Sequence, residues 1–300
     1  MTDTRINARP ASRWMGLLGA AMVVAPSVAH AQPLDLFYER TVMSAAGERC
    51  DLFTPQVAKA LAAAAVQARG AALRAGASPD RLETAERTAR VRAAQADCRS
   101  PELATAAQRV RQGFAGFSRV ARLTYPGDVG VWHADRAGGP GDPWRLRQDA
   151  AFGPDRMSFG LAGRAGPDAL VAAARFANGQ APYAARLVLR DTNRSLGPYL
   201  DRTRGGPTAG LPLARRMPPP GALTSFMAEA RAPAGDDLLG KGPQGWAFRF
   251  PPQAVRAIAA LDPREAIAVE FLFRGDRVRR AYVEVGDFAA DQAFLQMAAR

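Results

Sequence analysis

Residues that commonly carry catalysis are scarce in this chain. Its histidines are His30 and His133, whereas a zinc protease needs two histidines on one helix face with a glutamate between them. The segment 116–120, Gly-Phe-Ser-Arg-Val, lacks the second glycine of a serine-hydrolase elbow. Cys50 and Cys98 are too far apart for Cys-x-x-Cys redox chemistry, and no histidine accompanies them as a metal ligand. We therefore expect no catalytic residues of these classes, no cofactor and no metal site.

Carboxylate chemistry leaves one alternative open. Residues 239–242, Leu-Gly-Lys-Gly, are only a fragment of a phosphate-binding loop, because the Gly-Lys-Ser/Thr ending is absent. The two carboxylates of a glycosidase can come from any part of a chain, so such a pair is not excluded. The adjacent Asp236 and Asp237 lie in a Gly/Pro-rich segment, where a solvated turn explains them.

Aromatic residues near a chain junction are the first candidates for binding. Trp132, His133 and Trp144 flank a glycine-rich segment and could form a platform for a ligand. The same side chains could instead seal the junction between two domains.

Arginines in a second Gly/Pro-rich stretch are the next candidates. Arg204, Arg215 and Arg216 could bind phosphate or carboxylate groups through bidentate bonds, or could simply be solvated. Residues 274–276, Arg-Gly-Asp, match an adhesion tripeptide, but a tight hairpin turn also favours Gly-Asp.

The N-terminal segment has the three features of a secretory signal. Arg5, Arg9 and Arg13 form a basic leader, and an uncharged, mostly apolar run follows over residues 14–29. Ala29-His30-Ala31 then has the small-x-small pattern of a cleavage site. We expect residues 1–31 to be a signal peptide cleaved near Ala31, so that the mature protein is periplasmic or secreted and has no membrane span.

Composition favours a positively charged globular protein. Cleavage leaves 269 of the 300 residues, enough for two domains, and lowers the net charge from +12 to +10, because the signal carries three arginines and one aspartate. A positive field attracts anionic polymers. Acidic residues are interleaved along the chain, however, and this argues against a continuous stripe of basic residues that would bind nucleic acid. We expect no nucleic-acid partner; an anionic envelope polymer or another envelope protein is the expected kind of partner.

Residues 32–125 are alanine-rich and predict a helical bundle. The pairs Thr54-Pro55, Ser78-Pro79 and Ser100-Pro101 each match an N-cap residue followed by proline at the first helical position. Together with a helix near Leu34, they predict four helices, at 34–47, 55–75, 79–97 and 101–122. Short connections between them favour an antiparallel arrangement.

The helical topology makes a disulfide between Cys50 and Cys98 natural. One cysteine lies between the first and second predicted helices, and the other lies at the far end of the third. An antiparallel bundle returns both to the same end, and export places them in an oxidising compartment.

The second half of the chain predicts β structure. The glycine- and proline-rich segment 126–143 predicts a linker. Beyond it the apolar period approaches two, most clearly from Ile267 to Phe273, and residues 274–277 suit a tight hairpin turn. Residues 144–300 therefore predict an antiparallel sheet or sandwich.

Two further features complete the predicted second domain. The stretch near 205–221 is too proline-rich for a central strand and predicts a mobile loop. Asp287 is placed to cap a C-terminal helix. The predicted fold class is α+β, with a disulfide-clamped helical bundle followed by a β-rich domain.

The order of these elements resembles that of a known family. The second half of the chain predicts, in order, strands from Trp144 to Thr192, a proline-rich excursion, a strand at 246–251, a short helix, the hairpin at 267–285 and a closing helix at Gly286-Asp287-Phe288-Ala289. This order is similar to that of the secreted invasion-associated locus B family of alphaproteobacteria. The resemblance covers about half of the chain and implies a small exported β domain, non-enzymatic and associated with the cell envelope.

Two classes of function follow. The first is an exported, non-catalytic binding or envelope-interaction protein. The alternative is a hydrolase of an envelope polymer that uses a carboxylate pair, which would require two carboxylates roughly 5 to 10 Å apart in one pocket.

Overall fold

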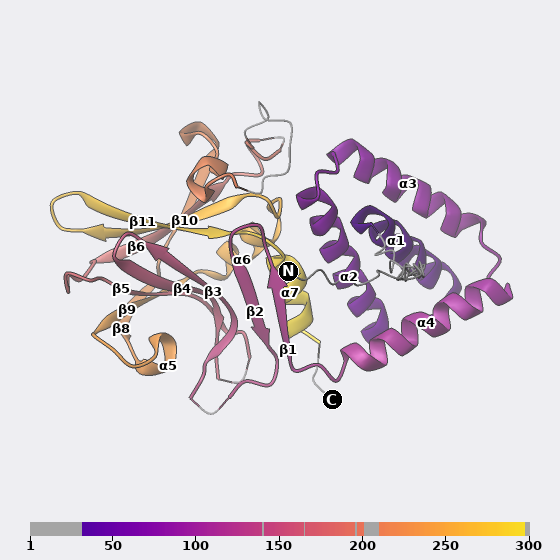
Figure 1. Cartoon of the computed structure of the whole chain (residues 1–300), viewed down its shortest axis with the longest axis horizontal. Coiled ribbons are helices and arrows are strands. Elements are labelled where there is room, and N and C mark those ends of the chain that lie inside the picture. Colours follow the sequence, from indigo (N-terminus) through magenta and orange to yellow (C-terminus); the bar gives the residue numbers. More distant parts are fainter. Residues whose placement is uncertain (1–31, 140, 165, 196, 201–209, 298–300) are drawn as a thin grey trace, which may run out of the picture. The chain divides into compact units, whose positions relative to one another are not determined.

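The computed structural model describes residues 32–139, 141–164, 166–195, 197–200 and 210–297, which belong to one compact unit (Figure 1). The predicted signal at residues 1–31 and the candidate Arg204 lie outside the described residues. Within these ranges the chain forms four N-terminal helices, two antiparallel sheets and a C-terminal helix. The predicted α+β fold class is confirmed.

The predicted helix starts are confirmed by their caps. The side chains of Thr54, Ser78 and Ser100 accept hydrogen bonds from the backbone N–H three residues ahead, at 3.5, 3.3 and 3.2 Å. Each cap is followed by proline at the first helical position. The helices are α1 (Pro33–Cys50), α2 (Pro55–Arg74), α3 (Pro79–Gln95) and α4 (Pro101–Phe117).

The bundle core lies between the first three helices. Phe37 of α1, Leu73 of α2 and Leu82 of α3 are buried together. Helix α4 is less embedded, since Leu103 and Ala107 near its start are its buried residues. It ends at Phe117, earlier than the predicted residue 122, and Figure 1 shows it running from the bundle toward the first strand.

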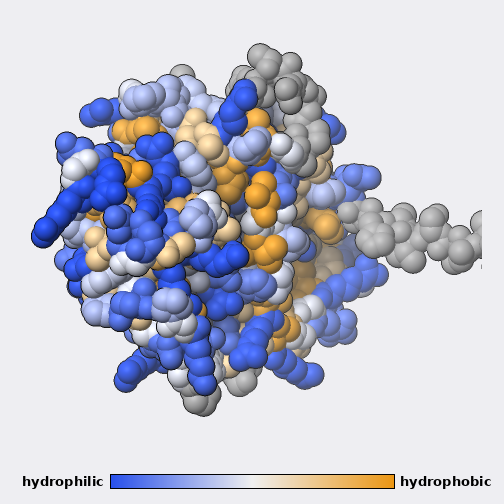
Figure 2. Space-filling view, turned by 60° about the vertical axis from the view of Figure 1, so that its left-hand side comes forward, coloured by the Kyte–Doolittle hydropathy of each residue, from blue (hydrophilic) through white to orange (hydrophobic). Residues whose placement is uncertain are grey.

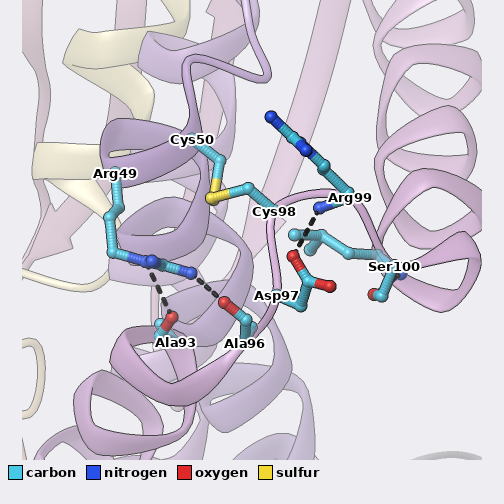
Figure 3. Close-up of a disulfide and its surroundings, with 9 residues drawn as sticks. Arg49, Cys50, Ala93, Ala96, Asp97, Cys98, Arg99 and Ser100 are labelled. Carbon is cyan, nitrogen blue, oxygen red and sulfur yellow. Dashed lines mark hydrogen bonds between the residues drawn. A yellow bond between two sulfur atoms is a disulfide. The ribbon is translucent and has the colours of Figure 1, made fainter.

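The predicted disulfide is confirmed. Cys50 and Cys98 are bonded, with their Cα atoms 5.5 Å apart, and Figure 3 shows the bond joining the end of α1 to the α3–α4 connection. Cys50 is the last residue of α1, not part of the following connection as predicted. The neighbouring Arg49 donates to the carbonyl oxygens of Ala93, at 3.2 Å, and Ala96. Two kinds of bond therefore hold this end of the bundle together.

A seven-stranded antiparallel sheet begins at the end of the predicted helical bundle and continues into the segment predicted to be a linker. Strands β1 (Arg122–Pro126) and β2 (Val131–Asp135) form a hairpin, and His133 and Ala134 of β2 pair with β3. Residues 126–143 are therefore not a free linker: part of them belongs to the sheet. In the described chain the sheet follows the order β1-β2-β3-β4-β5-β9-β8, with β3 (Trp144–Phe152), β4 (Asp155–Ala162), β5 (Ala169–Arg175), β9 (Gly245–Phe250) and β8 (Ala230–Ala234).

A second antiparallel sheet has four strands in the described chain. It follows the order β11-β10-β6-β7, with β11 (Arg277–Glu284), β10 (Ala266–Phe273), β6 (Ala184–Arg190) and β7 (Leu223–Met227). The predicted hairpin joins β10 to β11, and Gly275 and Asp276 both have positive φ, at 73° and 55°. Such a turn matches the twist of the flanking strands.

The main core lies between the sheets. Phe159 and Phe248 from the larger sheet and Leu187 and Phe271 from the smaller one are fully buried in one cluster. Short helices α5 (Asp236–Leu239), α6 (Pro252–Ala259) and α7 (Phe288–Leu295) accompany the sheets. The described part of the proline-rich stretch forms 3₁₀ turns at Leu213–Arg216 and Pro220–Ala222.

Candidate functional site

The helices and the sheets meet where α2 packs against α7. At the end of α2, the guanidinium of Arg74 makes two hydrogen bonds of 2.9 Å to the two carboxylate oxygens of Asp287. Burial opposes the charge of Arg74, but the bond to Asp287 and its negative charge prevail and raise the pKa of Arg74. Asp287 precedes α7 as predicted, yet its side chain makes no capping hydrogen bond. It joins the two halves of the fold instead.

One turn further along α7 lies a carboxyl group without a partner. Asp291 is fully buried, and neither of its oxygens has a hydrogen-bond partner among the described residues. Burial, and after it the charge of Asp287, raises the pKa of Asp291 well above its ordinary value. The neutral, protonated form is therefore favoured at this position.

A cavity of about 320 Å³ opens beside this junction, and we call it the junction cleft. It lies between α2 and α4, with contributions from α1, β1 and α7. Most of its lining is apolar. The lining residues are Arg40, Val57, Ala60, Leu61, Ala63, Ala64, Gln67, Val110, Gly113, Phe114, Phe117, Tyr125 and Ala290.

Small residues on the facing helices create the cleft. Helix α2 presents Ala60, Ala63 and Ala64 to it, and α4 presents Gly113, around whose Cβ position no atom lies within 4 Å. Phe117, at the end of α4, packs edge to face on Phe294 of α7, with ring centroids 5.4 Å apart. Helix α4 is thus held at both ends while its middle stands away from α2.

Three polar side chains reach this apolar space. Arg40 donates from Nη1 to the carbonyl oxygen of Ala64 at 2.6 Å. In the described part of the chain, no carboxylate forms a salt bridge with Arg40. Burial lowers the pKa of Arg40, and the charge of Glu39 offsets this only in part. The guanidinium is therefore a half-buried cation to which no carboxylate of the described residues bonds directly.

Gln67 and Tyr125 are the other polar groups. Tyr125 is 5% exposed, and burial, followed by the charges of Asp291 and Asp287, raises the pKa of its hydroxyl. The hydroxyl therefore stays protonated and can act as a hydrogen-bond donor. The cleft combines apolar walls with a few polar groups at a junction within the fold, which is the usual make-up of a small-molecule site.

Two larger hollows contain arginines that already have partners. In one of about 970 Å³, Arg279 contacts Asp155 at 2.7 Å. In another of about 930 Å³, Arg175 donates to the carbonyl oxygens of Leu239 and Pro243, both at 2.8 Å. These arginines hold loops and strands together.

A hydrolase of the kind considered above needs two carboxylates in one pocket. Asp168 and Glu229 both line a hollow of about 370 Å³. Both side chains are exposed, whereas the general acid of a glycosidase needs a desolvated environment that raises its pKa. This geometry favours a solvated surface over a catalytic pair.

The predicted aromatic platform is not assembled on the surface. Trp132 is fully buried in the main core, where Nε1 donates to the backbone oxygens of Glu284 and Val285 at 3.1 Å. Trp144 is buried in a separate cluster, and its Nε1 donates to the oxygen of Leu238 at 2.9 Å. Only His133 of the three is exposed. The tryptophans pack the fold, as the sealing alternative supposed, although not at a junction between two domains.

The predicted arginine group is also divided. Arg215 is exposed, but Arg216 is fully buried, with Nη1 3.2 Å from Oδ2 of Asp128 and 3.5 Å from Oε1 of Glu284. Arg216 is therefore neither a solvated residue nor open to an external anion. The Gly275-Asp276 step forms the hairpin turn described above.

The junction cleft itself was missed by the reasoning from sequence. Its signals were the alanine run of α2 and Gly113 within an apolar stripe of α4, which by themselves indicate ordinary helix packing. Arg40 carries no local motif. The cleft lies where α4 leaves the bundle and leads into β1.

On the face shown in Figure 2, hydrophilic side chains predominate and apolar ones gather in a narrow band. None of the described helices combines the length and the apolar character that a membrane span needs. Among the same residues, no cluster of three or more histidine, cysteine or acidic side chains could hold a metal ion.

Comparison with known proteins returned no match to the chain, whether among family models, curated proteins or solved structures.

Proposed function

We propose that this chain is an exported, non-catalytic binding protein that holds a small apolar molecule in the junction cleft. The observation that carries the proposal is the cleft itself: about 320 Å³ of space with apolar walls where the helices meet the sheet. Filling such a space removes apolar surface of both ligand and protein from water, at roughly 25 cal/mol per Å².

Export is supported by the disulfide and by the N-terminal sequence. A disulfide persists in oxidising compartments and is rare in the cytosol. Cleavage near Ala31 would deliver the protein to the periplasm or the exterior. The resemblance to the invasion-associated locus B family implies the same class, an exported protein without catalysis. Mass measurement of the protein recovered from the periplasm and the medium tests both the cleavage position and the compartment.

The binding test uses N-phenyl-1-naphthylamine, a dye whose fluorescence rises in apolar sites. Its ten-carbon naphthyl group, not the whole molecule, matches the space of the cleft. Gly113→Leu places a side chain in the open space of the cleft, and we expect it to weaken dye binding at least tenfold. Gly116→Leu is the matched control, because Gly116 lies on the same helix in open space and does not line the cleft.

Both substitutions replace a helical glycine and so favour α4 by a similar amount, about 0.8 kcal/mol. A difference between them in dye binding therefore reports on the cleft. Equal dye binding by the two variants, or no binding by the unmodified protein, would contradict the proposed function.

The hydrolase alternative is tested by a double variant, Asp168→Asn with Glu229→Gln, assayed for release of sugars from purified envelope polymers. The binding proposal expects no release by either protein. Release by the unmodified protein that the double variant loses would establish the alternative.

A further inference from the structure

Arg40 is half-buried beside apolar side chains, and the neighbouring charge of Glu39 offsets its burial only in part. A guanidinium has five N–H donors, and the described residues give this one a single hydrogen bond, to Ala64. Removing a charge from water without pairing it is costly, whereas a charge-assisted bond to a carboxylate recovers that cost. Arg74 shows the paired arrangement in the same fold, with Asp287 as its partner. Among the described residues, no carboxylate pairs with Arg40 in this way.

The space beside Arg40 limits the size of a ligand. At about 30 Å³ for each water-sized group, a cavity of about 320 Å³ holds roughly ten non-hydrogen atoms. Its walls come from alanine, valine, leucine and phenylalanine side chains, which contact hydrocarbon without directional demands. An unbranched chain of about this size can lie along the space between α2 and α4.

We propose that the ligand of the junction cleft is a single-chain anionic amphiphile, a medium-length fatty carboxylate whose head group pairs with Arg40 and whose chain lies between α2 and α4. This inference rests on the proposed function, because it names the class of molecule that the cleft takes. The carboxylate accepts hydrogen bonds from the N–H groups of Arg40 that do not bond Ala64. Phe114 and Phe117 cover the hydrocarbon chain of the ligand.

The experiment measures displacement of N-phenyl-1-naphthylamine by carboxylates from hexanoate to dodecanoate, and by decanol as the uncharged comparison. Each methylene that enters the cleft is expected to strengthen binding about fourfold. The gain is expected to stop near octanoate or decanoate, when the space is filled. Decanoate is expected to bind at least tenfold more tightly than decanol.

Arg40→Met keeps the length of the side chain and removes its charge. We expect it to weaken the binding of decanoate at least tenfold and to leave the binding of decanol unchanged. Arg40→Lys should give an intermediate affinity for decanoate. Arg109→Met is the control, because Arg109 is an exposed arginine of α4 that does not line the cleft. Thermal unfolding of each variant confirms that it is folded.

The outcomes separate the two proposals. If decanol and decanoate bind equally, or if Arg40→Met weakens both alike, the anionic class is wrong while binding in the cleft stands. If affinity keeps rising by the same factor per methylene up to dodecanoate, the proposed size of the ligand is wrong. If no compound displaces the dye and Gly113→Leu has no effect on dye binding, the proposed function itself fails.

Discussion

Arg216 and Glu284 form a fully buried ion pair, with Nη1 of the arginine 3.5 Å from Oε1 of the glutamate. The same carboxylate accepts hydrogen bonds from the backbone N–H groups of Asp128, Val129 and Gly130, at 2.9, 2.8 and 2.7 Å. One side chain of β11 therefore fixes the turn between β1 and β2 and anchors the proline-rich segment at the same time.

Loss of this anchor is expected to be costly. Glu284→Ala removes one carboxylate from the buried Arg216, which keeps its contact with Asp128, and takes the acceptor away from three part-buried backbone hydrogen bonds. We expect a loss of about 3 to 5 kcal/mol in the free energy of unfolding, measured by urea denaturation. Glu86→Ala is the comparison, since its pair with Arg90 is exposed and should contribute less than about 0.5 kcal/mol. A similar loss in both variants would contradict this account.

Asp291 predicts an unusual dependence of stability on pH. Its pKa is raised in the folded state, so between the unfolded value of about 3.9 and the folded value the native protein holds a proton that the unfolded chain releases. The contribution of Asp291 to stability is thus fully present below about pH 4 and is lost as the pH rises through the folded pKa.

Asp291→Asn removes this titration while nearly preserving shape. Relative to the variant, the unmodified protein should lose up to about 1.4 kcal/mol of unfolding free energy per pH unit above about pH 4. Asp287, Arg74 and Tyr125 are the charged or titratable groups that act on Asp291, and both proteins retain them. Parallel curves of stability against pH for the two proteins would rule out a raised pKa.

The disulfide is expected to be a major source of stability. Cys50 and Cys98 are 48 positions apart, and closing a loop of this length stabilises a fold by about 4 kcal/mol on the chain-entropy description. Replacing both cysteines by serine should lower the midpoint of thermal unfolding. Adding a reducing agent to the unmodified protein should reproduce that shift and leave the serine variant unaffected. If reduction leaves the midpoint unchanged, the bond contributes little.

The bond between Arg74 and Asp287 is expected to hold the helices on the sheets. Arg74→Met leaves Asp287 buried and unpaired, so we expect faster amide hydrogen exchange in α2 and α7. Amides near the Cys50–Cys98 bond should be less affected, because the disulfide and Arg49 hold that end of the bundle independently. Adding Asp287→Asn should recover part of the loss, since it removes the unpaired charge.

Local signals in the sequence predicted local structure well. The Ser/Thr-Pro pairs located three helix starts because their physics lies within four residues: a hydroxyl that accepts an N–H and a proline that needs none. The Gly275-Asp276 turn is equally local. The disulfide was predictable because the helix connections are short and set the topology.

Features that depend on distant partners were not predictable in this way. The segment 126–143 has the composition of a linker, but Trp132 within it is buried because the core formed by later strands receives it. Arg216 lies among prolines and glycines, and nothing nearby indicates that Asp128 and Glu284 will surround it. The junction cleft is a space between elements, and a linear pattern does not encode the distance between two helices.

The contacts of Glu284 also bear on the order in which parts of the chain can fold. Its bonds to the turn at residues 128–130 join positions more than 150 residues apart, so this turn cannot be fixed until nearly the whole chain is available to fold. The Cys50–Cys98 bond needs only the first hundred residues or so and can close much earlier. We therefore expect the helical bundle to form before the β1–β2 turn, which waits for β11, a strand of the smaller sheet near the end of the described chain.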